Sequence, residues 1–254
     1  GAEVSVSGEI LTHPEENEPG EISLASAQAT IQETQTAVAS SGASQTSGIK
    51  PVGPNFSHGD KKVAVVLLKK GENGVADITV AKAQERYFTG SNSAANFINV
   101  NSFGKTTLSS INDPNGDIYG YLTVPEDTSC KSYTYAGQSA ANAAGIDLSG
   151  YDYVSYVVDD AAVSGCGYAG YAYIGGRDQL MVSYNPGITT TGRATIEHEF
   201  GHNFGLWHAS SIQCVDANNA PVALVPNNAT CDLTEYGDLL DTMGNGWNSI
   251  PFSA

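Results

Sequence analysis

The sequence has little positive charge. Eleven Lys and Arg residues stand against 27 Asp and Glu residues, so the 254-residue chain carries a formal net charge of −16 at pH 7. Such an excess of acid repels phosphate backbones and anionic lipid head groups, and no local cluster of Lys or Arg offsets it. We therefore expect neither nucleic acid nor a membrane surface as a partner.

Long hydrophobic runs are also missing. The longest, Val63 to Leu68, is far shorter than the ~20 residues that a membrane-spanning helix needs. Hydrophobic residues nevertheless make up 41% of the chain, with 13 Tyr among the aromatics. This composition predicts a folded core, because disordered chains are poor in aromatic residues.

Cysteine is scarce, and the four cysteines contain no CxxC pair that would suggest a thiolate metal site. Two disulfides in an oxidising compartment are the favoured interpretation, with buried free thiols as the alternative. Of the three possible pairings we favour Cys130 with Cys166 and Cys214 with Cys231. We expect a secreted, extracellular protein.

Composition divides the chain at about residue 60. Residues 1–60 are predicted to be an N-terminal linker or prosegment-like region, because Ser, Thr, Ala, Gln and Gly dominate from Ser23 to Gly48. Within it, Val4 to Leu11 fits a short strand and Ser23 to Val38 a weak helix. Residues 61–254 are predicted to form the folded domain.

Beyond residue 60, apolar runs alternate with turn residues. The run from Lys62 to Leu68 is rich in β-branched residues and typical of a strand that is buried on both faces of a sheet. The other expected elements are helices at Ser91 to Val100 and Tyr135 to Ala144, and strands at Thr106 to Leu108, Tyr119 to Val124, Tyr153 to Val158, Gly170 to Gly176 and Leu180 to Tyr184. Their order predicts an α/β (α+β) fold with a mostly parallel sheet.

Residues 195–208 contain the pattern HExxHxxGxxH. His198 and His202 are one helical turn apart, so both imidazoles leave the same face of a helix and can bind one ion. On a continuing helix His208 would lie on the opposite side, so the helix must end before it. Gly205 is placed to end it, because a residue without Cβ adopts a positive φ at little cost.

Three neutral imidazoles leave a tetrahedral zinc ion one open position for water, which is the arrangement of a catalytic site. Glu199 is the candidate general base: it would take the proton of a water molecule whose pKa the zinc lowers to about 7 as that water attacks a carbonyl. The alternative, that surface or core histidines share this spacing by chance, is weak because three of the chain's five histidines fall in the motif.

A second metal is conceivable at Asp113-Pro114-Asn115-Gly116-Asp117, where oxygen ligands alternate as in calcium loops. The closing Glu of an EF-hand is missing, so an ordinary turn is preferred and Ca²⁺ stays the alternative.

The zinc pattern followed by a methionine resembles the metzincin clan of zinc peptidases. Met243 supplies the methionine within Glu235 to Gly244, a stretch that resembles the gametolysin family of secreted endopeptidases more than astacins, adamalysins or matrixins. Cys166 to Gly176 and Asn101 to Lys105 also resemble that family, and the likeness covers roughly residues 62–254.

This resemblance implies a mostly parallel twisted sheet with an antiparallel edge strand, an active-site helix, and a lower subdomain that contains the turn at Met243. It implies zinc bound by His198, His202 and His208, Glu199 as the base, and Met243 as a hydrophobic floor under the imidazoles. The edge strand would bind substrate as an added strand through its unpaired backbone groups. That strand corresponds to Tyr171, Ala172, Tyr173, Ile174 and Gly175; plain sheet and plain core packing are the alternatives for it and for Met243.

Two positions depart from the clan's patterns. Asn245 stands two residues after Met243, where some metzincins have a tyrosine ligand, so no fifth protein ligand is expected. Ala209 follows His208 where other members carry an acidic residue, which argues against those subfamilies.

The sequence thus predicts a monomeric, secreted zinc endopeptidase that hydrolyses peptide bonds of protein or peptide substrates. A catalytically silent zinc-containing binding module or adhesin is the rival, and the presence of Glu199 favours the enzyme. A third possibility is a latent form that retains residues 1–60 as a prosegment. Such latency could not use a thiolate, because no cysteine precedes Cys130.

Overall fold

The computed structural model describes the backbone of four short strands within residues 3–32, and residues 57–74, 78–159, 162, 165–183, 190–223 and 230–245. The chain divides into two compact units, Gly1–Gln45 and Thr46–Ala254. Every predicted site residue belongs to the second unit.

In the first unit, β1 (Glu3–Ser7) pairs antiparallel with β4 (Gln28–Gln32), and β2 (Ile10–Leu11) pairs antiparallel with β3 (Ser23–Leu24). The single strand predicted from Val4 to Leu11 is therefore two strands. The weak helix predicted from Ser23 to Val38 is wrong over the described residues, because β3 and β4 lie there. Long-range strand pairing outweighs the weak helical preference of this segment.

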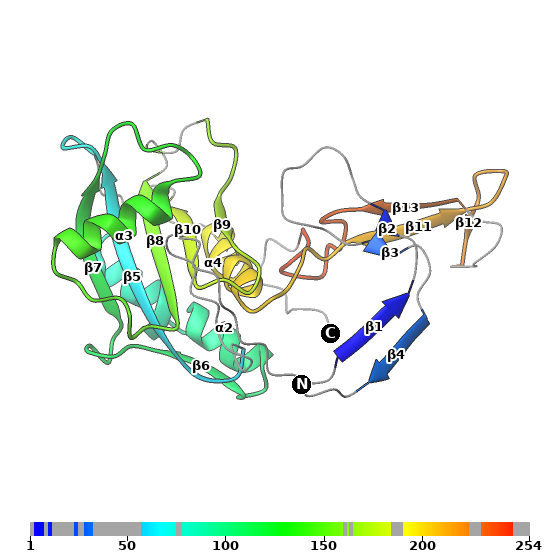
Figure 1. Ribbon diagram of the computed structural model, residues 1–254, viewed down its shortest axis with the longest axis horizontal. Coiled ribbons are helices and arrows are strands. Elements are labelled where there is room, and N and C mark those ends of the chain that lie inside the picture. Colours follow the sequence, from blue (N-terminus) through cyan, green and yellow to red (C-terminus); the bar gives the residue numbers. More distant parts are fainter. Residues whose placement is uncertain are drawn as a thin grey trace. The chain divides into compact units, whose positions relative to one another are not determined.

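In the second unit, the described residues form a six-stranded sheet in the order β6-β5-β8-β10-β9, with β7 also pairing with β5 (Figure 1). Its strands are β5 (Gly59–Lys70), β6 (Thr106–Ser109), β7 (Asp117–Val124), β8 (Tyr153–Asp159), β9 (Gly170–Ala172) and β10 (Asp178–Ser183). All pairs are parallel except β9 with β10, which is antiparallel. A mostly parallel sheet with an antiparallel edge strand is the predicted architecture.

Helices cover both faces of this sheet. Side chains from Val63 to Leu68 in β5 are at most 2% exposed, and they alternate between two hydrophobic clusters, as strand geometry requires. One cluster contains residues of α1 (Val80–Gln84), the π-helical turn η1 (Glu85–Thr89), α2 (Ala94–Asn101) and α4 (Thr190–Asn203). The other contains residues of α3 (Tyr133–Ala143).

The expected elements are found with small shifts, and one helical segment was missed. The helices predicted at Ser91 and Tyr135 begin at Ala94 and Tyr133. The missed segment is Val80 to Thr89, which forms α1 and η1. Within the part of the chain that the structure describes, no helix is long and apolar enough to span a bilayer.

The expected edge strand is shorter than predicted. The strand β9 ends at Ala172, and Ile174 and Gly175 form a turn instead, in which the Gly175 amide donates to the His202 carbonyl at 2.8 Å. That turn reverses the chain into β10, so the extended backbone cannot continue to Gly175. Tyr184, the predicted end of the following strand, lies outside the described residues.

Both predicted disulfides are present: Cys130–Cys166 and Cys214–Cys231. The second links β11 (Ser211–Val215) to β13 (Thr230–Thr234), which pair antiparallel, with β12 (Pro221–Val222) on the other side of β11.

The candidate calcium loop is closed by its own hydrogen bonds. The Asp117 carboxylate accepts the amides of Ile111, Asn112 and Asp113 and the hydroxyl of Tyr151. These hydrogen bonds hold the loop as a turn, and the Ca²⁺ alternative stays a prediction.

Candidate metal centre

The helix α4 carries His198 and His202, and it ends as the sequence predicts. Gly205 has a φ of +91°, its amide donates to the His202 carbonyl, and the Leu206 amide donates to the Gly201 carbonyl. This pair of bonds is a Schellman motif, which reverses the chain after the helix. The reversed chain brings the Leu206 carbonyl within 2.8 Å of His202 Nδ1.

Each of the three histidines uses Nδ1 as a hydrogen-bond donor to an oxygen. His198 Nδ1 donates to the Thr242 carbonyl at 2.8 Å, His202 Nδ1 to the Leu206 carbonyl, and His208 Nδ1 to Glu235 Oε1 at 2.5 Å. These acceptors carry no proton to share, so the neutral imidazoles keep their protons on Nδ1 and leave Nε2 bare.

The geometry of the bare nitrogens fits a metal ion. One ligand atom from each of His198, His202 and His208 lies within 4.8 Å of the others. Nε2 of His202 and Nε2 of His208 are 3.1 Å apart, and in this tautomer neither has a proton to place between them. Two lone pairs at that distance repel, and a cation bound between them removes the repulsion. Three imidazoles are a zinc ligand set that leaves a fourth position open.

The third histidine is held by the segment that follows the cross-linked hairpin. The Glu235 carboxylate accepts from His208, and the ring of Tyr236 lies against the His208 ring with centroids 3.7 Å apart. The same tyrosine stacks on His198 at 5.9 Å, and its φ of +58° turns the chain toward the histidines. Neither residue was predicted as a site residue, because Glu235 follows His208 by 27 positions in the sequence. The sequence signals near them were the Cys214–Cys231 pairing and the stretch from Glu235 to Gly244, which was quoted for its family resemblance.

The turn that contains Met243 is attached to the same histidines. Thr242 accepts the bond from His198, and the Met243 carbonyl accepts the amide of Ala209, the residue after His208. Met243 itself is 2% exposed. The turn therefore lies against the ligand histidines, while the floor under the imidazoles stays a prediction.

Glu199 lies beside the histidines and is 4% exposed. A Cβ added to Gly170 of β9 would stand 2.9 Å from Glu199 Oε1, so glycine at that position makes room for the carboxylate. Burial raises the pKa of Glu199 to about 8. A cation on the neighbouring imidazoles would lower this pKa toward the ionised form that a general base requires.

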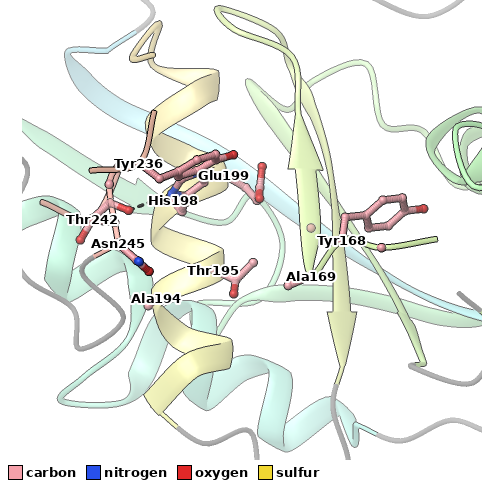
Figure 2. Close-up of a pocket in the computed structure, with 12 residues that line it drawn as sticks. Tyr168, Ala169, Ala194, Thr195, His198, Glu199, Tyr236, Thr242 and Asn245 are labelled. Atoms are coloured by element: carbon pink, nitrogen blue, oxygen red, sulfur yellow. Dashed lines mark hydrogen bonds between the residues drawn. The ribbon is translucent and has the colours of Figure 1, made fainter. Parts of the chain in front are cut away.

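A pocket of about 410 Å³ opens at this centre. Figure 2 shows Glu199 extending from α4 toward the segment that carries Ala169, with Thr242 and Asn245 on the opposite side of the helix. The ring of Tyr236 lies across His198 in this view. Of the predicted substrate strand, Tyr171 to Gly175, none lines this pocket; its neighbour Gly170 does.

A comparison with known protein families finds a match over part of the chain. Metallo-peptidase family M12B, reprolysin-like, matches residues 115–209, a segment that runs from the turn before β7 to just past His208. A comparison with curated proteins finds no match. The family match and the cluster of three histidines support a metzincin-like metallopeptidase with a zinc-dependent site, and the mixed α/β architecture is consistent with the metzincin fold. The family match does not test the predicted resemblance to the gametolysin family, which stays a prediction.

Proposed function

We propose that the chain is a secreted zinc endopeptidase of gametolysin type that cleaves peptide bonds in extracellular proteins. One observation carries the proposal: three imidazoles present bare Nε2 atoms to one point while a buried carboxylate, Glu199, follows the first of them on α4. A purely structural zinc site would have no use for that carboxylate. The two disulfides and the family match are consistent with an extracellular protein.

His198, His202 and His208 would hold the ion, each oriented by its Nδ1 hydrogen bond. Zinc, when bound, supplies Lewis acidity: it lowers the pKa of a water molecule and polarises a carbonyl group. The Glu199 carboxylate then accepts a proton from the attacking water and delivers it to the amine nitrogen of the leaving group. Gly170 gives this carboxylate the space to make both transfers.

Substrate would bind beside β9, the antiparallel edge of the sheet. An edge strand offers unpaired backbone groups to an extended peptide and does not select its side chains. Tyr171 and Ala172 lie in this strand, whereas Tyr173, Ile174 and Gly175 would act from the turn that follows. Protein and peptide chains are therefore the proposed substrates, with the enzyme acting as a monomer.

The test is Glu199→Ala. Ligation needs only the histidines, so the variant should keep the zinc stoichiometry of the wild type and lose peptidase activity by several orders of magnitude. Metal analysis and cleavage of a diverse peptide mixture, with and without a chelator, give both readouts. Activity close to wild type would refute the role of Glu199, and a wild-type chain that binds zinc without cleaving any peptide would favour the silent binding module.

A further inference from the structure

Three side chains between α4 and the sheet carry buried polar atoms without a partner. Gln179 and Asn203 are fully buried, and Glu199 is 4% exposed. Within the described residues, Nε2 and Oε1 of Gln179, Oδ1 of Asn203 and Oε2 of Glu199 have no hydrogen-bond partner in the protein. Buried polar groups in folded proteins are nearly always hydrogen-bonded, so a group of such atoms in one place needs an explanation.

The side chain of Gln179 faces α4. Residues alternate along β10, and Gln179 shares its face with Met181, which packs in one cluster with Ile196 and Phe200 of α4. The intervening Leu180 packs in the cluster on the opposite face.

The two residues of α4 lie on either side of Gln179. Asn203 Nδ2 donates to the carbonyl of Asp178, the residue before Gln179, at 3.4 Å. Glu199 lies near the residue after it, because a Cβ built on Gly170 would be 2.9 Å from both Glu199 Oε1 and the Leu180 carbonyl. Glu199 and Asn203 are four residues apart and so share one face of the helix, one turn from each other. Gln179 therefore lies in β10 between the two points at which these side chains approach the strand.

Two further polar side chains, Ser155 and Tyr87, lie near Gln179 on the face of the sheet that α4 covers. The register partner of Gln179 in β8 is Ser155, which is fully buried and hydrogen-bonded to the Tyr87 hydroxyl at 2.6 Å. Burial raises the pKa of Tyr87, the hydrogen bond to Ser155 lowers it, and the Glu199 charge raises it further, which places this phenol within electrostatic reach of the carboxylate. The Ser155 side chain therefore lies next to Gln179 on the same face of the sheet.

We propose that Gln179 is a positioning residue for Glu199, acting through one buried water molecule. That water accepts from Gln179 Nε2 and donates to Asn203 Oδ1 and Glu199 Oε2, which gives it the two to four polar partners that a buried water needs. Because the water binds Glu199 Oε2, the carboxylate keeps one orientation, with Oε1 available on the side of the three histidines. The role of Glu199 rests on the proposed peptidase function, whereas the water site does not.

The variant Gln179→Met tests the proposal, because methionine is close to glutamine in length and has no hydrogen-bonding amide. We expect unchanged zinc stoichiometry, a KM within about twofold of wild type and a kcat lower by about 10-fold, as when a group that orients a reactive side chain is lost. The Tm of the zinc-free protein should fall, because Asn203 and Glu199 lose their bridge. If Gln179 is instead a buried amide without a bridge, methionine relieves its desolvation, the Tm rises and kcat is unchanged. That result overturns the proposal.

The matched control is Gln138→Met on α3, which packs on the opposite face of the sheet. Gln138 donates to Asn142 and accepts from Tyr156, so the control loses hydrogen bonds through the same exchange. Its Tm should fall while kcat stays at the wild-type value. A lower kcat in the control would show that the kinetic loss is a general effect of destabilisation, and would overturn the positioning role.

The water itself is the second readout. A high-resolution crystal structure of the zinc-free protein should show an ordered water within hydrogen-bonding distance of Gln179, Asn203 and Glu199. A dry site overturns the proposal whatever the kinetics. If the Glu199→Ala test shows that the chain is not a peptidase, the direction of the Tm shift and the presence of the water still decide whether Gln179 holds this carboxylate.

Discussion

Replacing Glu199 by glutamine is expected to stabilise the zinc-free protein, and by more as the pH rises. Burial raises the pKa of Glu199 from its ordinary value of 4.5 to about 8. Between these two pH values the unfolded chain gives up the proton while the folded chain keeps it, so folding becomes less favourable by about 1.4 kcal/mol for each pH unit. The accumulated cost is about 3 kcal/mol at pH 7 and about 5 kcal/mol above pH 8. Glutamine cannot ionise, so the Glu199→Gln variant does not lose this free energy of folding.

The assay is denaturant unfolding of wild type and Glu199→Gln from pH 4 to pH 9 in the presence of a chelator. The difference in unfolding free energy should be constant below pH 4.5, grow between pH 4.5 and pH 8, and level off above pH 8. Glu72→Gln, at an exposed position, controls for the substitution itself and should show no such growth.

Adding zinc should narrow the difference, because a nearby cation favours the ionised carboxylate that the variant lacks. A difference that does not change with pH would mean that bulk solvent hydrates the Glu199 carboxylate in the folded protein. Burial would then not raise the pKa of Glu199, and the site would not lower the stability of the protein in return for a general base.

Two further predictions concern the metal centre, and a third concerns the first unit. Glu235→Gln should weaken zinc affinity by about 10-fold in a chelator competition without unfolding the protein, because Glu235 orients His208; unchanged affinity would show that this bond does not orient the ligand. Burial lowers the pKa of His202 to about 4, so protons compete with zinc for this ligand only at low pH, and zinc measured after equilibration should be lost as the pH falls toward 4; full occupancy at pH 3 would contradict histidine ligation. Deleting residues 1–45 should leave the second unit folded by thermal unfolding, and collapse would show that the first unit supplies core structure. A larger gain in activity on proteins than on short peptides would mark the deleted segment as steric cover.

The parts of the site that sequence predicted are those fixed by local geometry. His198 and His202 share a helix face because of their spacing, and Gly205 ends that helix because a glycine at this position takes a positive φ at little cost. The burial of the central strand β5 could also be predicted from local sequence, because an unbroken apolar run must be covered on both faces of a sheet.

The parts that sequence missed depend on contacts between distant segments. Glu235 meets His208 only because β11 and β13 pair in a register that brings the end of the hairpin back to its start. The helical segment from Val80 to Thr89 was missed although local sequence indicates it, because Val80, Ala83 and Tyr87 have the spacing of one helix face. The shortened β9 followed from the turn at Ile174, whose bond to α4 no strand pattern reveals.

The three ligand histidines are held in place by different parts of the chain. Two ligands lie on one helix, where the Leu206 carbonyl of the Schellman turn orients His202 and the Thr242 carbonyl orients His198. His208 lies beyond the helix, and later segments hold it. Those segments are the Glu235–Tyr236 pair and the turn whose Met243 carbonyl binds the Ala209 amide. An ion that binds all three histidines therefore ties the hairpin and the Met243 turn to α4, and its binding energy adds to the stability of that region. Zinc removal should accordingly loosen the hairpin before the sheet, because the sheet has its own buried core on both faces.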